Sequence, residues 1–249
     1  MITWLRTALF ALLATCSLVL HTPILLAGQF LPFERRYRLL FSFGRSLLWL
    51  ARVITGIRYE VEGIEHLDPN GGNLVLAKHQ SMWETMFLPS RLRFPVFVLK
   101  RELLRIPIFG QGLKAIVPIA IDRGAGRKAL TQILTQGKKA LSEGRDVVIF
   151  PEGTRRLPGT PPHYRIGGAM LAERSGARVI PMAVDSGCLW AKKGFRMRPG
   201  TIHVVFGPPI ETEGRTANEI NDATQKWIEA TQEALYTRHG CPNHVSDPA

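Results

Sequence analysis

The N-terminal part of the chain is strongly apolar, and no Lys, Arg, Asp or Glu occurs from Thr7 to Phe33. A helix needs about 20 apolar residues to cross the hydrocarbon core of a bilayer, so this segment is long enough in total. His21 and Pro23 interrupt it, and the uninterrupted part, 7–20, is short for a full span. Three interpretations stay open: a cleaved signal peptide, a transmembrane anchor and a helix lying in the membrane interface.

The next segment, 37–57, mixes leucine, phenylalanine and Trp49 with Arg38, Arg45 and Arg52. The seven-residue spacing places these arginines near one stripe of a helix whose remaining surface is apolar. A basic amphipathic helix of this kind suits the headgroup boundary of a bilayer. The alternative is a helix that packs on the following domain and keeps its arginines in solvent.

From about Val61 the pattern changes to short apolar runs that alternate with amphipathic helices. Helices are predicted over 127–142 and 218–237, where apolar residues recur on one face. Alternation of strands and helices is typical of an α/β domain with a largely parallel sheet. Buried strands are predicted at 73–77, 94–99, 116–121, 146–150, 178–184 and 201–206.

A length of 249 residues is enough for one such domain with a short appendage. We expect membrane-anchoring or interfacial helices over 1–58, one folded domain over 59–240 and a disordered tail over 241–249. Cysteines occur only at positions 16, 188 and 241, far apart in the sequence. This spacing predicts no disulfide framework, which fits a domain in a reducing cytosol.

The formal net charge of +12 and the pI of about 10.2 indicate an anionic partner. The chain has no zinc-finger spacing, aromatic RNA-binding motif or basic zipper, so a nucleic acid is not the expected partner. An anionic membrane surface fits the apolar N-terminus better. Arg35, Arg36 and Arg38 directly follow the apolar run, and the positive-inside rule then places the main domain in the cytoplasm, on the inner membrane.

His79 directly follows the predicted strand 73–77, at the end where sites of doubly wound sheets gather. A histidine there can serve as a general base, and Glu84 can hold its other ring nitrogen. The two residues are about 140° apart on a regular helix, so they meet only if His79 lies on the strand-to-helix turn. The structural alternative is equally specific, because Ser81 and Glu84 also have the spacing of a helix capping box.

Two further segments carry polar groups at strand ends. In the first, Phe150–Pro151–Glu152–Gly153–Thr154–Arg155, the glycine permits close backbone approach, Thr154 offers a hydroxyl and Arg155 can grip phosphate with two hydrogen bonds. In the second, Lys100 and Arg123 each follow a predicted strand and could line one anion-binding edge. The alternative for the first segment is a surface turn with solvated charges, and for Lys100 and Arg123 it is ordinary charges at strand ends.

The sequence lacks the motifs of several other enzyme classes and of common metal sites. The chain has no G-x-S-x-G elbow, no phosphate-binding P-loop, no complete dinucleotide fingerprint, and no paired C-x-x-C or H-E-x-x-H for a metal.

Taken together, the polar segments resemble those of the glycerolipid acyltransferase family, and most closely the 1-acyl-sn-glycerol-3-phosphate acyltransferases. The resemblance covers roughly 61–206, and several ordered blocks at plausible spacing make it specific. One departure is Glu84, since the family carboxylate is usually Asp. The matching segments are HQSMWE (79–84), the block 100–123, FPEGTR (150–155), YRIG (164–167) and IPM (180–182).

The resemblance implies a mixed, largely parallel sheet flanked by helices and preceded by a membrane-seating helical segment. It implies transfer of a fatty acyl group from acyl-CoA or acyl carrier protein to lysophosphatidic acid, with no cofactor, metal or acyl-enzyme. His79 and Glu84 would be catalytic; Lys100, Arg123, Glu152, Gly153, Thr154 and Arg155 would bind the substrate. The alternatives are acylation of another lyso-lipid, such as a lyso-aminolipid, and an inactive membrane-binding relative.

Overall fold

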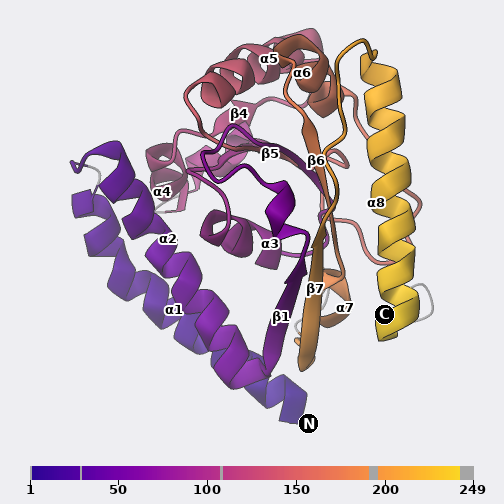
Figure 1. The fold of residues 1–249 in the computed structure, drawn as a ribbon. Helices are drawn as coiled ribbons and strands as arrows, with labels where there is room; N and C mark the ends of the chain where they lie inside the picture. Colours follow the sequence, from indigo (N-terminus) through magenta and orange to yellow (C-terminus); the bar gives the residue numbers. More distant parts are fainter. Residues whose placement is uncertain (1, 29, 107–108, 191–195, 242–249) are drawn as a thin grey trace.

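The computed structural model describes residues 2–28, 30–106, 109–190 and 196–241, and it contains a seven-stranded sheet with helices on both faces (Figure 1). The strand order is β1-β7-β6-β2-β5-β3-β4. Every neighbouring pair is parallel except β6 and β7, so β1 and β7 run against the other five strands. The strands are β1 (Ile57–Glu62), β2 (Leu74–Ala77), β3 (Val96–Lys100), β4 (Ile119–Ile121), β5 (Val147–Ile149), β6 (Val179–Val184) and β7 (Gly200–Phe206).

The prediction of a mixed, largely parallel sheet is therefore confirmed, and each predicted strand overlaps an observed one. The structure adds β1, which lies at one edge of the sheet beside β7. Its sequence, IRYEVE, exposes most of its side chains, including three charged ones, and so lacks the apolar run of a buried strand. Edge strands often carry charges, since one side of their backbone ladder faces water.

Two helices match the predicted ranges closely. One, α5, spans 127–142 as expected, and the other, α8, begins one residue earlier and ends two residues later than expected. A capping box between Thr216 and Glu219 starts α8. The helices are α1 (Ile2–Gly28), α2 (Phe33–Leu50), α3 (Trp83–Phe87), α4 (Phe109–Ala115), α5 (Arg127–Ser142), α6 (Gly167–Ser175), α7 (Ser186–Leu189) and α8 (Ala217–His239).

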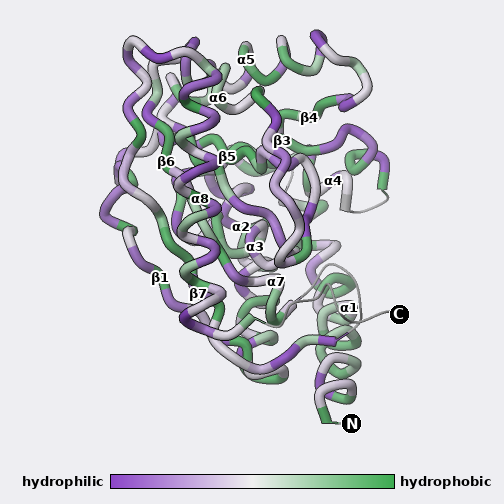
Figure 2. The backbone as a smooth tube through the Cα atoms, turned by 90° about the vertical axis from the view of Figure 1, so that its right-hand side faces the viewer, coloured by the Kyte–Doolittle hydropathy of each residue, from purple (hydrophilic) through white to green (hydrophobic). Residues whose placement is uncertain are grey.

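The apolar N-terminus forms one helix, α1, which continues through His21 and Pro23. Within the described part of the chain, it is the one helix long and apolar enough to cross a membrane, and almost none of its most apolar stretch is buried. Figure 2 shows the hydrophobic character along its length. Near its start it is docked on the domain: Thr7 accepts a hydrogen bond of 3.0 Å from the Met197 amide, and Phe10 packs edge-on against Trp190.

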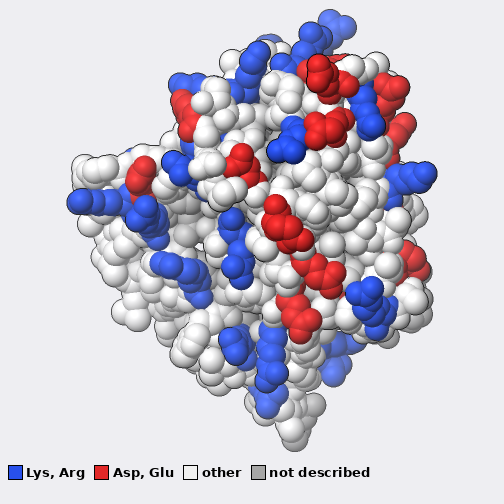
Figure 3. Space-filling model, in the orientation of Figure 1, with Lys and Arg blue, Asp and Glu red and all other residues white. Residues whose placement is uncertain are grey.

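The following helix, α2, is shorter than the segment 37–57 suggested. It begins at Phe33, and after Leu50 a π-helical turn, Ala51–Thr55, leads into β1 at Ile57. Basic side chains follow the side of the molecule that α2 occupies (Figure 3). Arg38, Arg45 and Arg52 are all exposed, so the polar stripe lies on the surface as both interpretations required.

Alternate side chains of the parallel strands enter two apolar cores. Val75, Ala77 and Val148 pack toward α2 and α3, whereas Leu74 and Leu76 pack toward α5 and α6. Because a strand points successive side chains to opposite faces, both faces of these strands must be apolar, which explains their continuous hydrophobic runs. Because β2 to β6 run parallel to one another, their carboxyl ends lie at one edge of the sheet, where polar side chains can meet.

The prediction that the cysteines form no disulfide is wrong. Cys188 of α7 is bonded to Cys241, 53 residues later in the sequence, and Cys16 is free and exposed. The reason is tertiary: α8 runs back along the sheet and ends beside α7 (Figure 1), and sequence spacing does not reveal this. Cys241 is the first residue of the predicted tail, and 242–249 lie outside the described residues.

Candidate active site

His79 lies on the turn between β2 and α3, as the catalytic interpretation required. Its Nδ1 atom is 3.5 Å from Oε2 of Glu84. This separation is at the outer limit of a hydrogen bond, and acid–base pairs are often this loose before substrate binds. The imidazole stacks on the ring of Phe150 with a centroid distance of 4.0 Å, so a side chain from the end of β5 also fixes its orientation.

The Glu84 carboxylate is completely buried and is surrounded by donors. The backbone amides of Gln80 and Ser81 donate to it at 3.1 Å, and the Ser186 hydroxyl also donates to it. Burial alone would raise the pKa of this carboxyl. The hydrogen bond and charge of His79, with the hydrogen bond from Ser186, hold the pKa below its usual value. The group is therefore kept ionised next to the imidazole.

The geometry of Glu84 contains one half of a capping box and also places its carboxylate next to His79. Its carboxylate receives the Ser81 amide, as in one half of a capping box, while the Ser81 hydroxyl accepts a hydrogen bond of 3.0 Å from the Trp83 amide. The same carboxylate faces His79. Glu84 thus fixes the start of α3 and the imidazole together.

The loop after β5 is tied directly to the His79 turn. Arg156 donates its backbone N–H to the His79 carbonyl at 2.8 Å. Gly153 has a φ of +67°, and a Cβ atom there would lie 3.2 Å from Nε of Arg165. Glycine is therefore required on two counts, the left-handed backbone and the close approach of an arginine. Thr154 is exposed and Arg155 is half-buried in the same loop.

Glu152 joins a buried ion network that the sequence did not reveal. Lys78 donates to Glu152 at 3.1 Å and to Glu229 of α8 at 2.7 Å, and the Tyr164 hydroxyl donates to Glu229 at 2.8 Å. Burial raises the pKa of the Glu152 carboxyl, and the charge of Lys78 opposes this rise. Its Oε2 atom is buried and accepts no hydrogen bond from a described side chain.

The predicted cations at the ends of β3 and β4 gather with one more arginine. Lys100 is exposed and forms an ion pair of 3.3 Å with Glu102. Partial desolvation and the positive charge of Arg165 lower the pKa of the Arg123 guanidinium, while Glu102 opposes this. Lys100 is paired in register with Ile121, two residues before Arg123. We call Lys100, Arg123 and Arg165 the cationic edge, and Arg165 also lies beside Gly153.

Sequence reasoning did not select four residues that the structure places around this site. Arg165 was visible in the YRIG segment. The partners Lys78, Ser186 and Glu229 had no local signal, because each is defined by contacts with distant segments. Among the described residues, no group of three His, Cys, Asp or Glu side chains is placed to hold a metal ion.

Comparison with known proteins shows the family to which the chain belongs. A family model described as Acyltransferase matches residues 58–185. The chain is 43% identical over 232 residues to a 1-acyl-sn-glycerol-3-phosphate acyltransferase of Pseudomonas aeruginosa, covering 91% of this chain and 90% of the relative. It is 32% identical over 182 residues to 1-acyl-sn-glycerol-3-phosphate acyltransferase alpha of Mus musculus, covering 71% of this chain and 63% of the relative.

The fold also matches a solved structure, the 1-acyl-sn-glycerophosphate (LPA) acyltransferase of Thermotoga maritima. The TM-score is 0.78 at 22% sequence identity, and the match covers 95% of this chain and 97% of the other. At that identity the likeness concerns the fold alone. The family model and the relatives of higher identity carry the assignment: this chain belongs to the acyltransferase family, together with the 1-acyl-sn-glycerol-3-phosphate acyltransferases.

Proposed function

We propose that this protein transfers a fatty acyl group from an acyl thioester to the free hydroxyl of lysophosphatidic acid, giving phosphatidic acid. The observation that carries the proposal is the His79–Glu84 pair at the carboxyl edge of the sheet, with a cationic edge beside it. The activity named for the relatives of highest listed identity supports the same reaction. The donor is acyl-CoA or acyl carrier protein.

In the proposed mechanism, Nδ1 of His79 faces Glu84, which leaves Nε2 for the substrate. Nε2 removes the proton of the acceptor hydroxyl as that oxygen attacks the thioester carbonyl. The C–O bond forms, the C–S bond breaks, and the imidazolium returns its proton to the leaving thiolate. Glu84 stabilises the imidazolium in between. No acyl-enzyme is required, because the thioester is already activated.

The acceptor phosphate is assigned to the cations around the loop after β5. Lys100, Arg123 and Arg155 would bind it, with Thr154 as a hydroxyl donor and Gly153 permitting close approach. The buried Oε2 of Glu152 accepts no hydrogen bond from a described side chain. Charge-assisted hydrogen bonds of this kind contribute on the order of 1.5–3 kcal/mol each. An acceptor without phosphate, such as a lyso-aminolipid, would not use these cations.

We further propose that α1 seats the protein on the inner membrane and that the domain faces the cytoplasm. Arg35, Arg36 and Arg38 after the apolar helix support this orientation. The Cys188–Cys241 disulfide weighs against a reducing compartment. Rapid alkylation of intact bacterial cells should trap both cysteines as thiols, while the purified protein oxidises. An oxidised pair in intact cells would contradict the cytoplasmic orientation.

Replacing the general base tests the reaction itself. His79→Ala should lower kcat at least ~10²–10⁴-fold, the range for positioned acid–base groups, without loss of folding. The assay measures acyl transfer by purified protein to a panel of lysolipids, with acyl-CoA and acyl carrier protein as alternative donors. Near-normal turnover by the variant would remove His79 from the mechanism. If the wild type transfers no acyl group to any acceptor, the interpretation as an inactive membrane-binding relative is correct.

Removing the Ser186 hydroxyl tests how Glu84 is held. Ser186→Ala should lower kcat roughly tenfold with little change in KM, because the serine touches the carboxylate and not the substrate. Since this donor helps to keep Glu84 ionised, the pair should bind a proton more tightly without it. The acid limb of the kcat/KM profile should therefore move to higher pH. Ser175→Ala on α6 is the control; an unmoved pH profile would mean that Ser186 is only structural.

Arg155→Ala tests the phosphate assignment. It should lower kcat/KM for lysophosphatidic acid by roughly ten- to a hundredfold, since ~1.4 kcal/mol is tenfold. Arg155→Lys should recover only part, because lysine lacks the planar fork. The measurement compares an acceptor with phosphate against one without it. Equal losses on both acceptors would assign Arg155 to the fold or the donor, and a wild-type preference for the phosphate-free acceptor would favour a lyso-aminolipid.

A further inference from the structure

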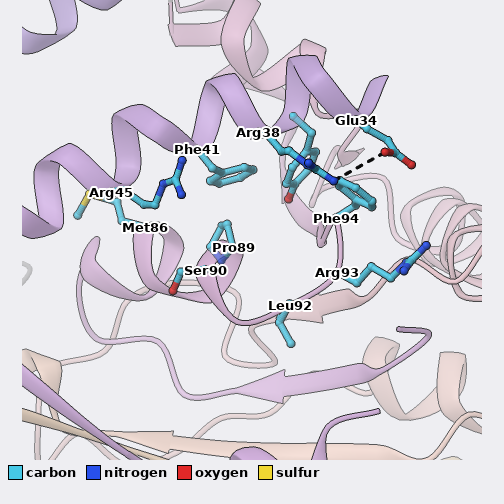
Figure 4. A pocket seen from close by; sticks show the side chains of 11 residues that line it. Glu34, Arg38, Phe41, Arg45, Met86, Pro89, Ser90, Leu92, Arg93 and Phe94 are labelled. Carbon is cyan, nitrogen blue, oxygen red and sulfur yellow. Dashed lines mark ion pairs between the residues drawn. The ribbon is translucent and has the colours of Figure 1, made fainter. Parts of the chain in front are cut away.

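A cavity of about 510 Å³ lies between α2 and the segment that connects α3 to β3 (Figure 4). It combines basic side chains with an apolar lining. Pockets that hold small molecules are typically of this size. Its lining includes Arg38, Phe41, Arg45, Ser90, Arg93 and Phe94.

The cavity is separate from the candidate active site. None of the eight predicted site residues lines it. Met86, which does, is two positions after Glu84 and so lies roughly 200° away around α3. The Glu84 side chain faces His79 on the other side of the helix. A molecule in the cavity would therefore not occupy the place of the reacting groups.

Its charge is suited to an anion. Three arginines and one carboxylate line it, and that carboxylate, Glu34, forms an ion pair of 3.9 Å with Arg38. Arg45 and Arg93 are exposed and form no ion pair with a carboxylate of the described residues. In Figure 4, Arg45 and Arg93 lie toward opposite ends of the cavity, with Phe41 and Leu92 between them. An anion with an apolar portion can contact both kinds of surface.

The wall that carries Arg93 is held in an unusual backbone conformation. Phe94 has a φ of +44°, which is rare for a bulky residue, and Pro95 follows it. The Tyr37 hydroxyl donates to the Pro95 carbonyl at 2.8 Å, and Asp146 accepts from the Arg93 amide. Such conformations persist where the surroundings over-determine them, often at ligand sites. The wall is therefore preformed.

The position of the cavity identifies the occupant. The helix that lines it, α2, packs against α1, whose outward side chains include exposed Leu9, Leu12 and Leu20. We propose that the cavity binds the headgroup phosphate of an anionic phospholipid of the bilayer, with its glycerol and first acyl carbons on the apolar lining. This proposal rests on the membrane seating proposed above and not on acyl transfer. It also accounts for two arginines of the predicted stripe, Arg38 and Arg45.

The test uses the full-length His79→Ala protein, which removes turnover, and dihexanoyl phosphatidylglycerol, a soluble anionic lipid that is neither acceptor nor product. Calorimetry should show one bound lipid per chain. Dihexanoyl phosphatidylcholine and inorganic phosphate should bind at least tenfold more weakly. Arg45→Gln and Arg93→Gln should both weaken binding, and the larger loss, roughly tenfold, should mark the end of the cavity that holds the phosphate. Ser90→Trp, which fills the cavity without changing its charge, should abolish binding.

Arg35→Gln is the matched control, because Arg35 is exposed on α2 and does not line the cavity. An equal loss in this control would reduce the effect to general surface charge. Full binding by Ser90→Trp would place the lipid elsewhere, and equal affinity for inorganic phosphate or for phosphatidylcholine would also overturn the proposal. The calorimetric outcome is independent of the proposed reaction, because it needs no turnover. In the active protein, Arg45→Gln should acylate a soluble short-chain acceptor at the wild-type rate, because Arg45 lies outside the candidate active site.

Discussion

Burial of charge is the constraint on which the site depends. Lys78, Glu84 and Glu152 are almost inaccessible to solvent, and a buried charge without partners costs several kcal/mol. Each therefore meets an oppositely charged or hydrogen-bonding group from another segment. Lys78 connects the end of β2 to the loop after β5 and to Glu229 of α8, and Glu84 is held by Ser186 after β6. These contacts fix the strand ends relative to one another.

The same contacts account for glutamate at position 84, where the family usually has aspartate. The side chain reaches His79, the amide of Ser81 and the hydroxyl of Ser186 at once. The glutamate side chain thus contacts the imidazole and also a hydroxyl at the start of α7. The imidazole itself is held between this carboxylate and the ring of Phe150. These two contacts fix the plane of the imidazole, and a shorter distance to Glu84 is expected once a substrate is bound.

Two kinds of surface meet where α1 and α2 join the domain. The outer side of α1 is apolar, and α2 presents arginines beside it. A lipid substrate and a lipid product both remain in the bilayer, so a domain docked on such a helix pair keeps its site close to them. Basic side chains thus lie both at the strand ends, where Arg123 and Arg165 are close, and along α2.

Most helices and strands of the domain, and the candidate catalytic pair, could be predicted from sequence alone. Periodicity located α5 and α8 and the six strands β2 to β7, because the side-chain pattern of one segment reflects its own burial. The placement of His79 after a strand, five residues before a carboxylate, was also local. Only the tertiary structure decided the reversed direction of β7, the edge strand β1, the Cys188–Cys241 disulfide and the partners of the buried charges. Glu84 and Ser186 are 102 residues apart, and Lys78 and Glu229 are 151 apart. No local pattern encodes such pairs, since they arise only when the sheet brings its strand ends to one edge.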